Sequence, residues 1–150
     1  MSIQVSMEHL TAIAQHGEYA YPHEGCGLLL GREVDGCKVV AEIVPVDNAR
    51  EFQAQHNRYL IPPDEVAKGE RIAMQKGMDI IGFFHSHPDH PARPSDFDRE
   101  HAWPWYVYLI TSVQEGHAVK TRAWSLADDR SVFNPEEIQD IDEREIVKRG

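Results

Sequence analysis

The pattern of hydrophobic and polar positions predicts three helices. Residues 6–20 carry apolar side chains at helical spacing, and Ser6 can cap this segment, which ends at Tyr21 and Pro22. A second helix is predicted from the proline pair at 62–63 to about Gly77, because proline and acidic residues are favoured in a first helical turn. A third, short helix is predicted over 95–102. The apolar face of the first helix is formed by Met7, Leu10, Ile13 and Ala14.

Short runs rich in apolar and β-branched residues predict strands between these helices. The segment 27–31 is an apolar run bounded by glycines, and 78–84 is a nearly continuous apolar run suited to a central strand. Asp35 and Gly36 form a turn signal before the β-rich segment 38–46. Two further strands are predicted at 105–110 and 120–126. Strands interleaved with helices indicate one α/β domain, in which helices cover a mixed sheet.

The C-terminal region admits two interpretations. Asn134 and Pro135, followed by two glutamates, resemble a helix start, whereas 131–133 could be a last edge strand leading into a frayed, charged terminus. Both are kept open. We therefore predict a domain over residues 1–133 and a charged tail, helical or frayed, over 134–150.

Composition narrows the class of function. The chain has 150 residues, of which 41% are hydrophobic and 27% charged, as in an ordinary globular domain. Its net charge of −10 disfavours nucleic acid as a partner, because basic side chains supply most of the affinity for phosphate. No apolar run is long enough for a membrane span and the N-terminus does not resemble a signal peptide, so no membrane role and a cytoplasmic location are expected.

The two cysteines limit the possible metal sites. Cys26 and Cys37 are too few for a disulfide scaffold or a four-cysteine zinc site, so a metal would depend on histidine and carboxylate ligands. Cys26 lies beside a predicted core strand, and we expect it to be a small buried residue rather than a nucleophile.

The segment after the predicted central strand carries the strongest chemical signal. His85 and His87 are two residues apart in an extended chain, so their imidazoles point to the same side. Three prolines restrict the following loop, and Asp98 then lies in the first turn of the predicted third helix. Two imidazoles and a carboxylate are typical of catalytic zinc with an open position for water. Taken alone, Ser95 and Asp98 also fit an ordinary helix cap, and His101 is a reserve ligand.

A zinc-bound water needs a base to take its proton. The spacing does not identify that base, because no acid follows the histidines at helical spacing and many acids occur elsewhere. Glu24, which precedes a predicted core strand, is one candidate among them.

The combined pattern resembles the JAMM, or MPN-plus, metalloproteases. Their signature is an upstream glutamate followed by His-Ser-His-Pro-x(6)-Ser-x-x-Asp, and every position is matched here, by Glu24, His85, Ser86, His87, Pro88, Ser95 and Asp98. The resemblance implies that His85, His87 and Asp98 bind Zn²⁺, that Glu24 is the general acid/base and that Ser95 stabilises the oxyanion. It also implies the family's cytidine-deaminase-like fold, a curved mixed sheet flanked by helices.

The resemblance further implies a substrate class. The compact members of the family act on ubiquitin-like sulfur-carrier proteins, cutting after a C-terminal Gly-Gly, and we expect such a carrier as the partner here. Two alternatives stay open: a non-catalytic MPN-type interaction domain, and a zinc hydrolase of small amides. The oligomeric state is not indicated by the sequence.

Overall fold

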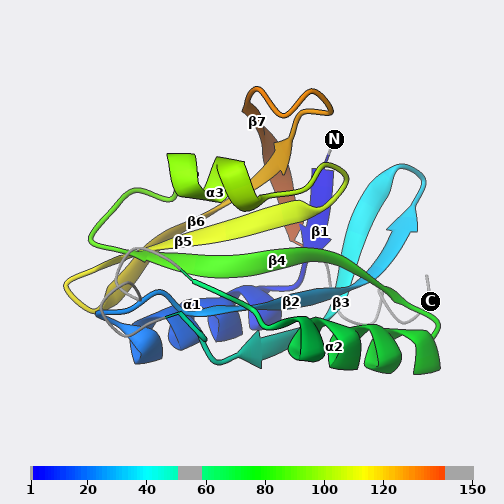
Figure 1. Ribbon diagram of the computed structural model, residues 1–150, viewed down its shortest axis with the longest axis horizontal. Coiled ribbons are helices and arrows are strands. Elements are labelled where there is room, and N and C mark those ends of the chain that lie inside the picture. The colour runs from blue at the N-terminus through cyan, green and yellow to red at the C-terminus, as the bar shows by residue number, and fades with distance from the viewer. Residues whose placement is uncertain (1, 51–58, 141–150) are drawn as a thin grey trace.

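The computed structural model describes residues 2–50 and 59–140 (Figure 1). Three helices lie in this part of the chain, and they begin and end within two residues of the predicted bounds. The five predicted strands are also present, extended by one to four residues at several of their ends. In order, the elements are β1 Ser2–Val5, α1 Met7–Ala20, β2 Cys26–Val34, β3 Cys37–Val46, α2 Pro63–Gln75, β4 Asp79–Pro88, α3 Asp96–His101, β5 Val107–Gln114, β6 His117–Leu126 and β7 Phe133–Asp140.

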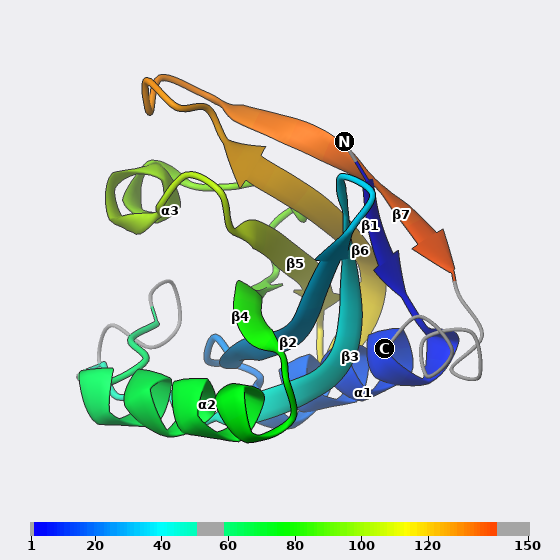
Figure 2. The same cartoon turned by 90° about the vertical axis from the view of Figure 1, so that its right-hand side faces the viewer.

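The strands form one closed barrel in the order β1-β3-β2-β4-β5-β6-β7, with β7 pairing back onto β1. Figure 2 shows the strands curving around the barrel, with α1 below them and α2 outside. Strand β1 is parallel to β3 and β7, and β4 is parallel to β5, whereas the other pairs are antiparallel. The predicted fold class, a curved mixed sheet flanked by helices, is confirmed.

The C-terminal region differs from both interpretations of the sequence. Residues 134–140 are not helical; they continue strand β7, which lies between β6 and β1 rather than at an edge. The sheet therefore extends beyond residue 133. Ile138 packs against the core, and this contact depends on β1, a four-residue strand that the sequence pattern did not reveal. Residues 141–150 lie outside the described part of the chain.

Two apolar layers cover the two faces of the central strands. Inside the barrel, Leu29 of β2 and Ile81 of β4 pack with Ile13 of α1. On the outer face, Leu28 and Leu30 pack with α2. Because both faces of the first part of β2 are covered, residues 26–30 are continuously apolar rather than alternating. Close packing also explains Gly27, where a Cβ atom would lie 2.2 Å from the Phe84 ring.

Strand β4 lies at the centre of this arrangement, between β2 and β5. Its C-terminal end carries the two predicted metal-binding histidines, and the chain then passes through a loop to α3. The first residues of β2 lie beside the same end of β4, with Cys26 opposite His85. The topology therefore brings the Glu24 segment, the histidines and α3 together. None of the described helices has the length and apolarity of a membrane span.

Candidate metal centre and catalytic site

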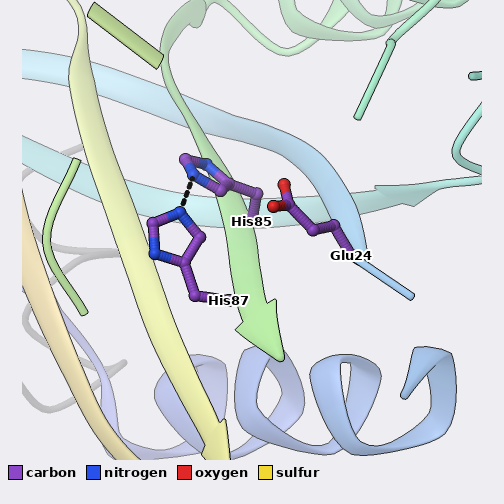
Figure 3. Close-up of side chains that lie close together, drawn as sticks. All are labelled: Glu24, His85 and His87. Carbon is purple, nitrogen blue, oxygen red and sulfur yellow. Dashed lines mark hydrogen bonds between the residues drawn. The ribbon is translucent and has the colours of Figure 1, made fainter. Parts of the chain in front are cut away.

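His85 and His87 are buried on one side of β4, as their spacing predicts. They are 1% and 5% exposed, and their Nε2 atoms lie 3.2 Å apart. Figure 3 shows both imidazoles beside the carboxylate of Glu24. Ligand atoms of Glu24, His85 and His87 all lie within 4.8 Å of one another, so this buried group is positioned to bind a metal ion.

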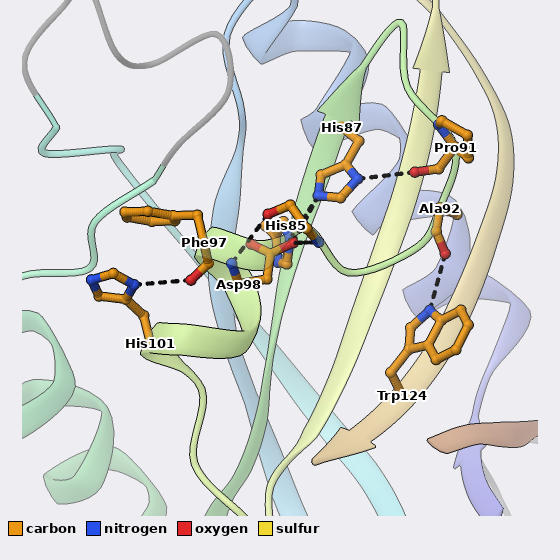
Figure 4. Close-up of polar contacts among 9 residues, drawn as sticks. His85, His87, Pro91, Ala92, Phe97, Asp98, His101 and Trp124 are labelled. Atoms are coloured by element: carbon orange, nitrogen blue, oxygen red, sulfur yellow. Dashed lines mark hydrogen bonds and ion pairs between the residues drawn. The ribbon is translucent and has the colours of Figure 1, made fainter. Parts of the chain in front are cut away.

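Asp98 completes a compact triangle with the two histidines. Its Oδ2 lies 3.1 Å from His87 Nε2 and 3.3 Å from His85 Nε2 (Figure 4). A tetrahedral ion with bonds of about 2.0–2.1 Å requires ligand atoms about 3.3 Å apart. The three edges of 3.1 to 3.3 Å therefore fit a small tetrahedral cation without rearrangement of the side chains.

The hydrogen-bonding partner of His87 fixes its tautomer. Its Nδ1 lies 2.9 Å from the carbonyl oxygen of Pro91, which can only accept, so the hydrogen is on Nδ1. Neutral His87 therefore presents the lone pair of Nε2 toward Asp98 and His85. Lone pairs at this spacing need a shared hydrogen or a cation between them, and a histidine held by a backbone carbonyl is common at metal sites.

Burial and mutual charge set the protonation of the triangle. Burial lowers the pKa of His85. Burial also lowers the pKa of His87, but the hydrogen bond and charge of Asp98 outweigh it and raise that pKa overall. Burial alone would raise the pKa of Asp98, yet the two histidines hold it well below its usual range. Asp98 is therefore an anion at neutral pH, as a metal ligand must be.

Glu24 is a buried acid without an ordinary partner. It is 4% exposed, and its Oε1 has no hydrogen-bond partner among the described residues. Burial raises its pKa to about 8; the charge of His87 opposes this effect and that of Asp98 adds to it. Its backbone is held by Asn48, whose Nδ2 donates to the Glu24 carbonyl at 3.0 Å. An unpaired carboxyl group next to a metal-ligand set is suited to exchange protons with a reacting molecule.

A loop held by side chains of β5 and β6 supports His87. Three consecutive carbonyl groups each accept from a different side chain: His90 from Ser112 Oγ at 2.6 Å, Pro91 from His87, and Ala92 from Trp124 Nε1 at 3.0 Å. Figure 4 shows the last two of these bonds. The position of the Pro91 carbonyl, and with it the orientation of the His87 ring, therefore depends on both neighbouring strands.

Ser95 forms the helix cap that the sequence also suggested. Its Oγ accepts from Asp98 N at 3.1 Å, and Ser95 N donates to Asp98 Oδ2 at 2.8 Å. The capping box thus orients the carboxylate of Asp98 toward the histidines. The Ser95 hydroxyl hydrogen is not used by these bonds, and the residue lines the cavity that adjoins Glu24.

Two other residues that the sequence analysis considered for the site, His101 and Cys26, do not belong to this cluster. His101 is exposed, and its Nδ1 donates to the carbonyl of Phe97, so it does not join the triangle. Cys26 is fully buried and its thiol lies against the Val46 carbonyl, as expected for a structural residue. Burial raises its pKa to about 12.

The sequence pattern did not point to several residues that shape the site. The ring of Tyr59 stacks on His85 with centroids 4.5 Å apart. Trp124 and Ser112 reach the loop from strands far along the chain, and no spacing rule connects them to it. Their sequence-level signal is weak: Ser112 is a polar side chain on a strand otherwise rich in buried residues, and Trp124 is an amphipathic side chain near the end of a largely exposed strand.

Two cavities adjoin the cluster. The larger, about 540 Å³, is lined by Glu24, His87, Phe97 and the loop before α3. The smaller, about 290 Å³, is lined by Asp98, Phe97, Tyr59 and apolar side chains such as Phe83 and Tyr108. The cluster is therefore accessible from two sides.

Two named prokaryotic proteins are similar to this chain in sequence. A desampylase of Haloferax volcanii is 38% identical over 92 residues, which cover 61% of this chain and 63% of that protein. A probable TtuB-protein conjugate cleaving protease of Thermus thermophilus is 30% identical over 96 residues, covering 62% and 60%. The chain thus matches about three fifths of the length of each of these relatives. Both names denote the cleavage of protein conjugates, that is, hydrolase activity.

Solved structures share the fold over nearly the whole chain. A protein from Salinibacter ruber is 41% identical, with a TM-score of 0.73 over 95% of this chain and 92% of that one. AF2198, a JAB1/MPN domain protein from Archaeoglobus fulgidus, is 18% identical with a TM-score of 0.54, covering 93% of this chain and all of that one, which shows the fold alone. The family model described as prokaryotic homologs of the JAB domain matches residues 6–127. This match covers the buried cluster and all strands of the barrel except β1 and β7, and the chain belongs to the prokaryotic JAB-domain family.

Proposed function

We propose that the chain is a zinc-dependent metallopeptidase that hydrolyses the peptide or isopeptide bond after the C-terminal Gly-Gly of a ubiquitin-like or sulfur-carrier protein. The observation that carries this proposal is the triangle of His85 Nε2, His87 Nε2 and Asp98 Oδ2, with edges of 3.1 to 3.3 Å, beside the unpaired carboxyl group of Glu24.

The donor set favours zinc. Two imidazoles and one carboxylate form a three-ligand site that leaves one tetrahedral position open, as in catalytic zinc sites. Bound there, zinc would polarise the scissile carbonyl and lower the pKa of a water molecule from about 15.7 to about 7. The anionic state of Asp98 and the Nδ1 hydrogen of His87 leave both residues ready to bind such an ion.

The residues of the chain would move the proton. Glu24 takes a proton from the attacking water, since its carboxylate borders the cluster and its Oε1 has no other described partner. The protonated Glu24 then gives that proton to the nitrogen of the leaving amine, which departs as a neutral amine. A pKa raised by burial suits a group that must both accept and release a proton near neutral pH.

Ser95 would stabilise the charge that develops on the carbonyl oxygen. Its hydroxyl accepts one bond within the helix cap, and its hydrogen is available to donate to an oxyanion in the adjoining cavity. Helix capping and oxyanion stabilisation use different parts of the same hydroxyl group, so one residue can serve both purposes.

The names of the relatives support a conjugate as substrate. One relative is a desampylase by name, and the other is named as a probable protease that cleaves TtuB–protein conjugates. A Gly-Gly tail suits a site that is enclosed by Tyr59, Phe97 and the loop before α3, because glycine adds no side chain that would collide with these walls.

The test combines metal analysis with cleavage. Protein purified after expression with ample zinc should hold one zinc per chain, and it should cleave a carrier–peptide fusion after Gly-Gly. Glu24→Gln should keep the zinc but lose at least a hundredfold in turnover, whereas Glu70→Gln, an exposed control on α2, should match the wild type.

Each alternative predicts a different result. Absence of zinc, or a Glu24→Gln variant as active as the wild type, would contradict the proposal and favour a non-catalytic interaction domain. Equal turnover of short amides and carrier fusions would favour a hydrolase of small amides, because binding of the carrier would then contribute nothing to the transition state.

A further inference from the structure

The two cavities beside the cluster contain different catalytic groups. Glu24 and His87 line the larger cavity, whereas Asp98 and Tyr59 line the smaller one. Phe97 lines both cavities, so the two lie next to each other at this residue. A substrate whose scissile bond lies at the cluster would therefore place its acyl part in one cavity and its amine part in the other.

The position of Glu24 decides which part lies where. The proposed proton donor must reach the nitrogen of the departing amine within hydrogen-bond distance. Glu24 lines the larger cavity and is not among the residues that line the smaller one. The larger cavity therefore receives the leaving group, and the smaller, more apolar cavity receives the acyl side.

The rim of the leaving-group cavity carries an arginine that has no ion-pair partner among the described residues. Arg93 lines this cavity and is exposed. Its backbone N donates to the Pro91 carbonyl at 2.8 Å, but in the described residues its guanidinium makes no hydrogen bond or ion pair. The nearby rim acid, Asp96, is 94% exposed and pairs with Arg99 instead.

The backbone that carries Arg93 is held firmly. The preceding residue, Ala92, is buried and its carbonyl accepts from Trp124, and Pro94 follows directly. The same loop orients His87 through the Pro91 carbonyl. The position of the arginine is thus tied to the catalytic cluster, although its side chain is free to bind a ligand. A guanidinium group matches a carboxylate with two parallel hydrogen bonds.

We propose that Arg93 is a specificity-determining residue that binds the α-carboxylate of the leaving group. The inference rests on the proposed function, and among its substrates it predicts a preference for carriers whose Gly-Gly is followed by a single amino acid with a free carboxylate. In such a leaving group the carboxylate lies one carbon from the departing nitrogen. The lysine of a conjugated protein offers only methylene groups in the corresponding place.

Two substrates test this inference separately from the proposed function on which it rests. The first is a carrier ending in Gly-Gly-Ala with a free carboxylate, and the second is the same chain with a terminal carboxamide. Zinc-loaded wild-type protein should cleave the free acid with a kcat/KM about 10- to 100-fold higher, as expected for a charge-assisted pair. Arg93→Gln should reduce this ratio to near one, and Arg93→Lys should retain part of it.

The control is Arg71→Gln, which removes an exposed arginine on α2 and should keep the wild-type ratio. If the wild-type ratio of kcat/KM for the two substrates is near one, or if Arg93→Gln leaves it unchanged, the role of Arg93 is overturned. Cleavage of both substrates would still support the proposed function. Failure of the wild type to cleave either substrate would overturn both. Equal zinc content in the variants excludes an indirect effect through the metal site.

Discussion

Ser86 is bonded twice to the backbone of Gly25. Its N–H donates to the Gly25 carbonyl at 3.0 Å, and its Oγ accepts from the Gly25 N–H at 2.8 Å. These bonds join the residue between the two histidines to the residue directly after Glu24. The serine of the His-Ser-His segment therefore connects the strand that carries the proposed metal ligands to the segment that carries the proposed acid/base.

Ser86→Ala tests this connection. The substitution leaves the Gly25 N–H unpaired in a site that is almost inaccessible to water, which should cost about 1–3 kcal/mol in the free energy of unfolding. Because Glu24 loses one of its supports, turnover should fall at least tenfold while zinc content is unchanged. Ser131→Ala, an exposed control, should change neither. Normal turnover would show that Ser86 does not position Glu24.

Glu24→Gln should stabilise the metal-free protein at neutral pH. Burial raises the Glu24 pKa from 4.5 to about 8, so the folded state binds more protons than the unfolded state between these values, and stability falls as the pH rises through them. Over the roughly 2.5 units from 4.5 to pH 7, at about 1.36 kcal/mol each, the penalty is about 3 kcal/mol.

The measurement is the free energy of unfolding of both proteins in urea, with a chelator, from pH 4 to 8. The advantage of Glu24→Gln should be small below pH 4.5 and grow with pH. A difference that does not depend on pH would contradict the raised pKa.

Ser95 can be tested for its two roles separately. Ser95→Gly keeps an acceptable helix cap, costing only a few tenths of a kcal/mol, but removes the hydroxyl group. If the hydroxyl stabilises the oxyanion, kcat should fall by about 10²–10³, and Ser95→Thr should restore part of it. A Ser95→Gly variant with intact zinc and wild-type kcat would limit Ser95 to capping α3.

Trp124→Phe should weaken metal binding from a distance. It retains most of the ring but leaves the buried Ala92 carbonyl without its donor, which loosens the loop that orients His87. Changes to groups that support metal ligands typically cost 10- to 100-fold in affinity, and we expect about tenfold in the zinc dissociation constant. Competition with a chromogenic chelator measures it. Trp105→Phe, at a half-exposed position, is the matched control.

Thiol reagents should not reduce the proposed cleavage activity through Cys26. The side chain is fully buried and its pKa is about 12, so almost no thiolate is present at pH 8. Native protein treated with iodoacetamide should retain its activity and an unmodified Cys26 by mass spectrometry, whereas unfolded protein should be modified there. Inactivation with labelling of Cys26 would favour a thiol mechanism.

The close approach of His85, His87 and Asp98, the proposed metal ligands, was predictable because its determinants are local. Two histidines two apart on a strand share a side, and a proline-restricted loop followed by a capped helix returns Asp98 to them. Glu24 was different. Its place depends on β2 pairing with β4 and on Ser86 holding Gly25, which are contacts some 60 residues apart along the chain. Resemblance identified it, and spacing alone did not.

In the fold, too, the elements set by local sequence were predictable and those set by long-range contacts were not. Helices and buried strands follow from periodicity and were placed well, whereas β1 and β7 were not. Strand β1 has four residues, too few for a clear pattern, and β7 contains Pro135 and two glutamates that resemble a helix start. The extended conformation of β7 comes with its pairing to β6 and to β1, whose residues lie more than 130 positions away. Trp124 and Ser112 were missed for the same reason, since their roles exist only in the folded structure.

The pairing of β1 with β7 has a consequence for synthesis of the chain. Ile3 and Val5 of β1 belong to the barrel core. One backbone edge of β1 pairs with β3, and the strand that pairs with its other edge is formed by residues 133–140. During translation the backbone edges of β1 and β6 are therefore open until nearly the whole domain has emerged from the ribosome. Open edges of this kind template aggregation, and such long-range closure slows folding. Nascent chains that stop before Phe133 should be the aggregation-prone species.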